Sequence, residues 1–184
     1  MLNKTLISSL LSTLCFVYTS NTLDVAPPDI PQLIPNNQIN LTNYISSKYS
    51  IDDDKAYNIS SWIIEASDVY DIPMEKLAAV VAIESSFRDN VRSGAGAYGL
   101  AQINRKVWKN DLIGEIYDFM NDPRDNVFAG AHILSLYKEK CGGWECAIKA
   151  YNVGITMYRM KKNIAQHYNN KVINVEQEIK NYLS

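Results

Sequence analysis

The most constraining feature of the sequence is an alanine-rich segment that begins at Pro73 and reads PMEKLAAVVAIESSF. Proline is tolerated in the first turn of a helix, and most of the residues after it have high helix propensity. Leu77, Val80 and Glu84 are spaced so that they share one face of such a helix. The segment therefore predicts a helix over 73–86 that buries one face and carries a carboxyl group on it.

The other patterned segments also favour helices. A helix is expected from Pro123 to about Lys140, and two glycines separate it from a short helix over 144–152. In the tail, apolar residues recur every three or four positions, which predicts an amphipathic C-terminal helix over 161–184. Strand signals are scarce, so the expected fold class is mainly α.

The first 20 residues have the layout of a secretory signal peptide. Lys4 precedes an apolar core over 6–17, and small and polar residues follow it. This core is shorter than the roughly 20 apolar residues that a helix needs to span a bilayer, which disfavours an uncleaved anchor. Lipid attachment at Cys15 is the rival interpretation, and Leu14 disfavours it because a small residue is needed there. We therefore expect a signal peptide over 1–20 and a location in the periplasm or cell envelope.

The segment over 21–59 is rich in Pro, Asn and Ser and shows no clear helical period, so it is expected to be an extended linker. Within it, the acidic run from Asp52 to Asp54 is expected to be a solvated turn. A calcium loop is the alternative, but the spaced ligands and the central glycine of an EF-hand are missing. The linker would precede one compact helical domain over 60–160.

Composition narrows the classes of partner. The 184 residues contain 18 Lys and Arg against 20 Asp and Glu, a net charge of −2, which gives no basic excess for holding a nucleic acid. Two histidines and three cysteines occur without the spacing of a local zinc site. We expect no nucleic-acid partner and no metal, and we expect His132 and His167 to be surface or packing residues.

The position of Glu84 suggests that this residue is a general acid. Burial of a carboxyl group disfavours its charged form, so a place on an apolar helix face predicts that its pKa lies above the usual glutamate range. A carboxyl group that stays protonated near neutral pH is what a general acid in a cleft requires. The alternative is that Glu84 turns into water or pairs with Arg88 four residues later. Position alone does not decide between the two.

Three motifs in order along the chain add to this picture. They are ESSF at 84–87, GAYGLAQI at 96–103 and AYNVG at 150–154. Their order and separation resemble the catalytic domain of the SLT-type lytic transglycosylases, which are relatives of goose-type lysozyme. The segment DPRDNV at 122–127 is similar to the D-P-x-x-N-I helix start of the same family. The resemblance covers about residues 60–160.

The resemblance implies a lysozyme-like helical fold and an activity on peptidoglycan. The family cleaves the β-1,4 bond between N-acetylmuramic acid and N-acetylglucosamine and leaves 1,6-anhydro-muramyl ends, with no water consumed. The residue at the position of Glu84 is first the acid and then the base, and the substrate's own acetamido group assists. Most glycosidases use two carboxylates instead, and Asp89, the obvious second candidate, is expected to face away from Glu84. Ala101 stands where the family usually has Met, which would widen or reshape the sugar cleft. No cofactor is implied.

The resemblance also implies roles for residues around Glu84. Gln102 would hold an N-acetyl or hydroxyl group of the sugar, and the alternative is an amide bonded to neighbouring backbone. Tyr151 would direct its hydroxyl at Glu84 or at the sugar, and the alternative is a core aromatic residue. Gly99 and Gly154 are expected to meet backbone requirements that a Cβ would prevent. The implied substrate-binding residues are Ser85, Gln102, Tyr151 and Asn152, of which Ser85 could instead merely end the helix.

Cys141 and Cys146 flank a short segment that contains two glycines. In an exported chain they are expected to form a disulfide, since Cys15 would leave with the signal peptide. The alternative is a pair of free thiols, because this separation does not ensure that the side chains meet.

The expected partner is therefore a peptidoglycan glycan strand. The modest size of the domain resembles the specialised transglycosylases that open the cell wall locally for secretion, conjugation or pilus assemblies. A goose-type lysozyme-like hydrolase and a non-catalytic peptidoglycan-binding protein remain as alternatives. The C-terminal helix is expected to dock onto the domain or, alternatively, to contact a partner.

Overall fold

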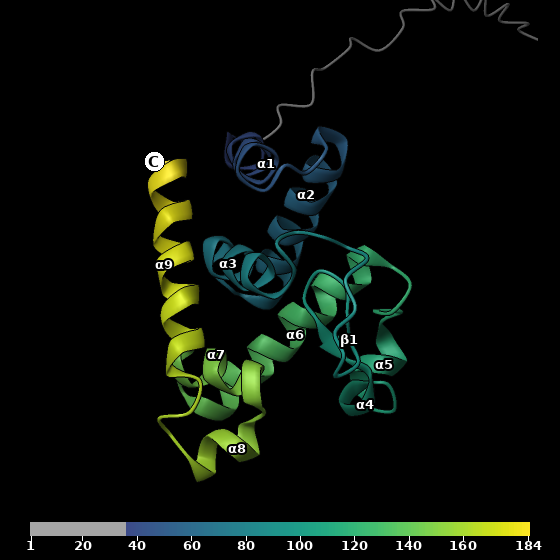
Figure 1. Ribbon diagram of the computed structural model, residues 1–184, viewed down its shortest axis with the longest axis vertical. Helices are drawn as coiled ribbons and strands as arrows, with labels where there is room; N and C mark the ends of the chain where they lie inside the picture. The colour runs from purple at the N-terminus through teal and green to yellow at the C-terminus, as the bar shows by residue number, and fades with distance from the viewer. Residues whose placement is uncertain (1–35) are drawn as a thin grey trace, which may run out of the picture. The chain divides into compact units, whose positions relative to one another are not determined.

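The computed structural model describes residues 36–184, which form helices joined by turns and one short hairpin (Figure 1). The mainly α fold class is confirmed. None of these helices combines the length and the apolar character needed to cross a membrane. The signal peptide expected over 1–20 lies outside the described residues. In chain order the elements are α1 (Asn36–Tyr49), α2 (Asp53–Tyr70), α3 (Met74–Ser85), β1 (Ala97–Tyr98), β2 (Ile103–Asn104), α4 (Arg105–Trp108), α5 (Leu112–Ile116), α6 (Pro123–Cys141), α7 (Trp144–Val153), α8 (Ile155–Met160) and α9 (Gln166–Leu183).

Helix α3 is buried on nearly all sides. Each residue from Leu77 to Ala82 is at most 4% exposed, and α2 and α9 both pack against the helix. A helix that is apolar around its whole circumference needs partners on every side. The helix expected over 73–86 is therefore present and is the central element of the core.

The linker prediction is wrong over 36–59. Helix α1 and the first part of α2 occupy these residues, and Leu41, Tyr44 and Ile45 of α1 are at most 1% exposed. Asn and Ser give α1 a weak intrinsic helix propensity, but its apolar side chains pack against α2 and α9, and tertiary packing supplies most helix stability in proteins. The remainder of the expected linker, 21–35, lies outside the described residues.

The acidic run begins a helix instead of forming an isolated turn. The side chain of Asp52 accepts a hydrogen bond from the backbone N–H of Lys55, and Asp53 and Asp54 lie in the first turn of α2. Acidic side chains are favourable there because they face the positive end of the helix dipole.

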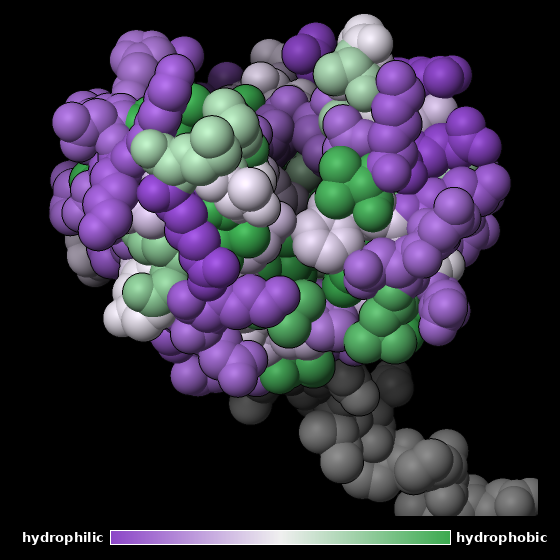
Figure 2. All heavy atoms as spheres, turned by 90° about the horizontal axis from the view of Figure 1, so that it is seen from below, coloured by the Kyte–Doolittle hydropathy of each residue, from purple (hydrophilic) through white to green (hydrophobic). Residues whose placement is uncertain are grey.

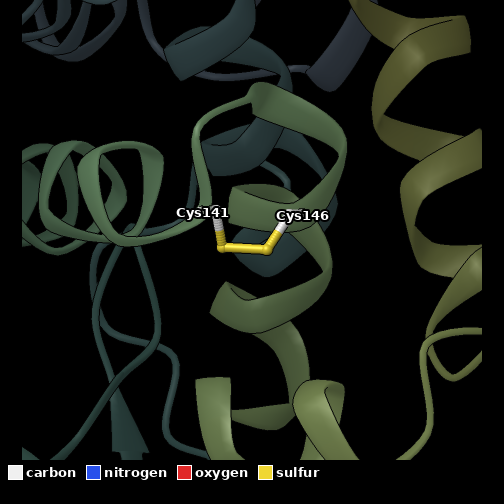
Figure 3. The surroundings of a disulfide bond; sticks show 2 residues. All are labelled: Cys141 and Cys146. Atoms are coloured by element: carbon white, nitrogen blue, oxygen red, sulfur yellow. A yellow bond between two sulfur atoms is a disulfide. The ribbon is translucent and has the colours of Figure 1, made fainter.

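Helices α6 and α7 are packed together and covalently linked. Asp122 caps α6 by accepting a hydrogen bond from the backbone N–H of Asp125 at 3.0 Å. Cys141 and Cys146 form a disulfide, with Cα atoms 5.6 Å apart, that joins the last residue of α6 to the first turn of α7 (Figure 3). The disulfide thus fixes the start of the helix that carries Tyr151.

The C-terminal helix docks onto the domain. Helix α9 starts at Gln166, five residues later than expected, and Val172 and Ile179 on its inner face are fully buried. It packs against α1, α3 and α7. Helix α9 consequently lies beside α3 (Figure 1).

Candidate active site

A cavity of about 380 Å³ gathers most of the residues that the sequence motifs point to. Seen from the end that carries α4 and α8, the surface is hollowed between two lobes (Figure 2). The hairpin β1–β2, which pairs Ala97 with Asn104, forms part of one wall. The lining residues are Glu84 of α3, Ile133 and Tyr137 of α6, Ser93, Ala95, Ala97, Gln102, Ile103, Asn104, Val107 and Trp108 around the hairpin and α4, and Tyr151, Asn152, Val153 and Gly154 at the end of α7.

Glu84 lies at the cavity because α3 ends directly after it. Ser86 and Phe87 both have left-handed backbone conformations, with φ of 53° and 58°, and the Phe87 side chain is fully buried. Glu84 is partly buried. Burial raises its pKa above the ordinary glutamate value of 4.5, as the sequence predicts, and a hydrogen bond from Tyr168 offsets only part of this rise.

Tyr168 of α9 is a site residue that the motifs do not identify. Its hydroxyl donates a hydrogen bond to Oε1 of Glu84 at 2.5 Å. Burial and the neighbouring Glu84 carboxyl group both raise the pKa of Tyr168, so it remains a hydrogen-bond donor. The sequence shows Tyr168 only as a member of the periodic tail, and no local pattern links it to a residue 84 positions earlier.

Glu84 is the only carboxylic acid that lines this cavity. Asp89 faces elsewhere and forms an ion pair with Lys55 at 3.1 Å. Arg88 is exposed, and its Nε donates to the backbone carbonyl of Ser85 at 3.1 Å, so within residues 36–184 it forms no ion pair with Glu84. A mechanism that needs a second protein carboxylate at this cavity is therefore not supported.

Gln102 lines the cavity and is also bonded to backbone. Its Nε2 donates to the carbonyl oxygens of Gly99 and Val91, at 2.9 and 3.1 Å. Both amide hydrogens are used in this way, which fixes the side chain and leaves Oε1 as the atom able to accept from a ligand. The two interpretations of Gln102 in the sequence are thus compatible.

Tyr151, which was expected to point its hydroxyl at Glu84 or at the sugar, bonds to backbone instead. Its hydroxyl donates to the backbone carbonyl of Ala101 at 2.7 Å, and not to Glu84. Gly130 of α6 makes this approach possible, because a Cβ there would come within 2.6 Å of the Ala101 Cβ and 3.1 Å of the Tyr151 hydroxyl. The tyrosine therefore holds the GLAQ segment in place from α7.

Asn152 and Ser85 differ in their access to the cavity. Asn152 is exposed and lines it. Ser85 is 2% exposed, is absent from the cavity lining, and donates through Oγ to the carbonyl of Val81 at 3.2 Å. Ser85 is the last residue of α3 and bonds within the helix, outside the cavity lined by the other expected substrate-binding residues.

Gly99 is required both by its conformation and by a close contact. Its φ is 73°, and a Cβ would come within 2.8 Å of the Asn126 side chain. Asn126 is 1% exposed; its amide donates to the carbonyls of Tyr98 and Phe119 and accepts from the N–H of Ala101. The DPRDNV segment thus contributes a structural clamp on the loop that carries Gln102.

Gly154 has a φ of 81°, and a Cβ on it would meet nothing within 4 Å. The turn from α7 to α8 therefore requires glycine for its backbone conformation and not for space.

The histidines lie outside the cavity. His132 stacks on the ring of Tyr70, with centroids 5.0 Å apart, and burial lowers its pKa. His167 is exposed. Among the described residues, no three His, Cys, Asp or Glu side chains gather in a way that could hold a metal ion.

A second polar contact joins α3 to α9 away from the cavity. Lys76 of α3 lies 2.5 Å from Glu176 of α9, and their side chains are only 9% and 10% exposed. Lys76 precedes Glu84 by eight residues and Glu176 follows Tyr168 by eight, so the two helices run antiparallel with one polar contact toward each end.

Comparison with known proteins identifies the family of the chain. The family described as Transglycosylase SLT domain matches residues 61–174. A transglycosylase of Enterobacteria phage PRD1 is 33% identical over 89 residues, which cover 48% of this chain and 32% of the phage protein. A peptidoglycan-binding-like protein of Escherichia coli O157:H7 is 28% identical, with 54% of this chain and 68% of that protein covered. The chain thus spans about a third of the length of the phage protein. No solved structure matches the chain.

Proposed function

The chain belongs to the Transglycosylase SLT domain family, and from that premise we propose that it is a peptidoglycan lytic transglycosylase. It cleaves the β-1,4 bond between N-acetylmuramic acid and N-acetylglucosamine and leaves 1,6-anhydro-muramyl ends. The observation that carries the proposal is a single carboxyl group, Glu84, whose pKa is raised by burial at a cavity that it shares with the family motifs.

In the proposed reaction Glu84 acts twice. Protonated Glu84 gives its proton to the glycosidic oxygen as the bond from that oxygen to C1 of the muramyl residue breaks. The substrate's 2-acetamido group stabilises the electron-poor C1. The Glu84 carboxylate then takes the proton of the muramyl 6-hydroxyl while O6 bonds to C1, which closes the anhydro ring and restores the protonated acid. No second carboxylate is needed.

The surrounding residues have distinct tasks in this scheme. Tyr168 holds the Glu84 carboxyl group through its hydrogen bond and stabilises the charged form after proton transfer. Oε1 of Gln102 and the exposed amide of Asn152 are the groups placed to bind the sugar. Tyr151 acts indirectly, because its hydrogen bond fixes the position of the Ala101 carbonyl.

The proposal includes a place and a partner. A murein-cleaving enzyme acts in the cell envelope, which agrees with the export signal expected over 1–20. Its substrate is the glycan strand, and its role is local opening of the wall for a secretion or conjugation apparatus. These assignments rest on family analogy.

The test is the chemical identity of the products. The purified protein, Glu84→Gln and the matched control Glu139→Gln on the exposed side of α6 are each incubated with peptidoglycan, and the soluble fragments are analysed by mass spectrometry. Anhydro-muramyl fragments from the wild type and the control, but not from Glu84→Gln, are the expected result.

Other outcomes would redirect the assignment. Reducing muramyl ends would make the protein a lysozyme-like hydrolase. Cleavage that survives in Glu84→Gln would remove this residue from the mechanism. Binding without any soluble product from the wild type would make it a non-catalytic peptidoglycan-binding protein.

A further inference from the structure

The charges of this acidic chain are unevenly distributed along the sequence. Two stretches, 90–110 and 146–175, contain no Asp or Glu. They nevertheless carry nine basic residues, half of the 18 in the chain. The first has Arg92, Arg105, Lys106 and Lys109, and the second has Lys149, Arg159, Lys161, Lys162 and Lys171.

The same two stretches form most of the cavity described above. Of its lining residues only Glu84, Ile133 and Tyr137 come from elsewhere in the chain. The acid-free segments therefore meet in space as the two walls of one cleft. A protein with a net charge of −2 thus has walls free of acidic residues around the group that performs the proposed chemistry.

Eight of the nine basic residues are exposed, and they form no ion pair with any residue of the part of the chain that the structure describes. Lys149, by contrast, is buried against Glu145, and Arg92 stacks on Tyr98. Lys171 lies on α9, which contributes nothing to the cavity lining, and Lys162 lines a separate cavity together with Glu145. We call the remaining five the mouth cations. They are Arg105, Lys106 and Lys109 in and after α4, and Arg159 and Lys161 in and after α8.

The mouth cations are positioned by cavity-lining segments. Val107 and Trp108 of α4 line one wall, and Gly154, directly before α8, lines the other. Figure 1 shows α4 and α8 at the same end of the domain, and Figure 2, viewed onto that end, shows hydrophilic and hydrophobic side chains side by side on both lobes.

Exposed apolar residues lie among these cations. Val107, Met157 and Met160 are 59%, 42% and 72% exposed. A polymer of phosphates would use the cations alone, whereas a short peptide with free carboxylates and small apolar side chains would use both kinds of residue. We propose that the mouth cations, with these apolar neighbours, bind the carboxylate-bearing peptide stems of the glycan strand. The proposal rests on the proposed function, because the stems are those of the strand held at Glu84.

The test measures binding separately from cleavage. Peptidoglycan is coupled to beads through its glycan hydroxyl groups, so that the glycan stays on the beads after an amidase has removed its stems. Glu84→Gln, which is expected not to cleave, is mixed with the intact and with the stripped beads, and the bound fraction is measured by sedimentation of the beads. Lys106→Ala with Lys109→Ala, and Arg159→Ala with Lys161→Ala, are introduced into this background. The matched control, Lys140→Ala with Lys171→Ala, removes two exposed lysines, one at the end of α6 and one on α9, that form no ion pair with the described residues.

We expect each mouth pair to weaken binding to intact peptidoglycan by about three- to tenfold, as for the loss of exposed ionic contacts. The control pair should have no effect, stem removal should abolish the difference, and added salt should reduce it. Equal binding of the mouth variants and the control, or equal effects on stripped glycan, would overturn the proposal. So would a preference for a soluble phosphate polymer over stems.

Different results would contradict the transglycosylase assignment and the proposal of stem recognition. If wild-type protein yields no soluble fragments while the mouth variants still lose stem-dependent binding, the transglycosylase assignment fails and stem recognition stands. If cleavage is normal and the mouth variants bind like the control, only the stem proposal fails.

Discussion

Two glutamates lie between the same pair of helices in opposite surroundings. Glu84, at the cavity end of α3, meets one tyrosine hydroxyl, and burial raises its pKa. At Glu176 of α9, burial also acts to raise the pKa, but contacts with Lys180 and Lys76 outweigh it and the pKa is lowered. One carboxyl group is therefore poised to carry a proton and the other to remain charged.

The comparison shows that burial alone does not decide the role of an acid. Glu176 is 7% exposed where α9 packs on α3, and Glu84 is partly buried beside Tyr168 of α9. The sign of each pKa shift depends on whether a cation is within reach. The charged pair toward one end also holds α9 in the position that brings Tyr168 to Glu84, so the structural acid supports the chemical one.

The largest expected effect is on the cleavage rate, which should depend on Glu84 and not on Glu176. Replacing the chemical acid, Glu84→Gln, should lower the cleavage rate by about 10²- to 10⁴-fold, the range for loss of a general acid. Its midpoint of urea unfolding should stay equal or rise slightly, because a carboxyl group that is costly to ionise is gone. The release of soluble fragments measures the cleavage rate, and a urea titration measures the unfolding midpoint. A variant that unfolds more easily but cleaves normally would invert the assignment.

The second-largest expected effect concerns Glu176, whose replacement should lower the stability of the fold. Glu176→Leu leaves Lys76 buried without its partner and should cost about 3 kcal/mol of unfolding free energy. The matched control is Lys76→Met combined with Glu176→Leu, which removes both charges and should recover most of the loss. Urea unfolding of the three proteins measures this. Equal destabilisation by the single and double variants would show that the charge pair is not responsible.

Acidification should act on Glu176 in the opposite direction from Glu84. A lowered pKa gives stability that is present above the ordinary glutamate pKa of 4.5 and is lost as pH falls through the lowered value. A raised pKa works the other way, since protonation of Glu84 on acidification favours the folded state. The wild type should therefore lose more free energy between neutral and acid pH than the Lys76→Met, Glu176→Leu double variant. Parallel pH curves would contradict this.

The smallest effect concerns Tyr168. Tyr168→Phe removes a hydrogen bond that lowers the pKa of Glu84, so this pKa should rise and the alkaline limb of the cleavage profile should move to higher pH. The rate should fall about fivefold, as for the loss of one hydrogen bond of about 1 kcal/mol. Tyr182→Phe, which is half-exposed on the same helix, is the control and should match the wild type. An unchanged profile in Tyr168→Phe would mean that this contact does not tune the acid.

Local patterns were enough to predict much of this arrangement. The segment over 73–86 identifies the helix. Its spacing makes a buried Glu84 with a raised pKa one of two interpretations, and the packing of other segments decides between them. Proline, aspartate and glycine signals mark the ends of α6 within about a residue, since caps depend on neighbouring backbone atoms only.

The remaining features depend on contacts between distant segments. Tyr168 and Glu176 act on α3 from positions 84 and 100 residues later, and no periodicity reveals their partners. Helix α1 was missed because its polar composition hides three apolar residues whose burial is supplied by α2 and α9. The Tyr151 hydroxyl was expected to point at Glu84 or at the sugar, and its partner within the protein is the backbone carbonyl of Ala101, which the sequence does not specify.

The most direct test of the comparison is a titration of both carboxyl groups in one protein. Side-chain ¹³C resonances of labelled glutamate, assigned with Glu84→Gln and Glu176→Gln, are followed by NMR as pH is varied. The account predicts that Glu84 titrates above the ordinary value of 4.5 and Glu176 below it. A midpoint for Glu84 at or below that of Glu176 would contradict the claim that the surroundings of these two acids separate their roles.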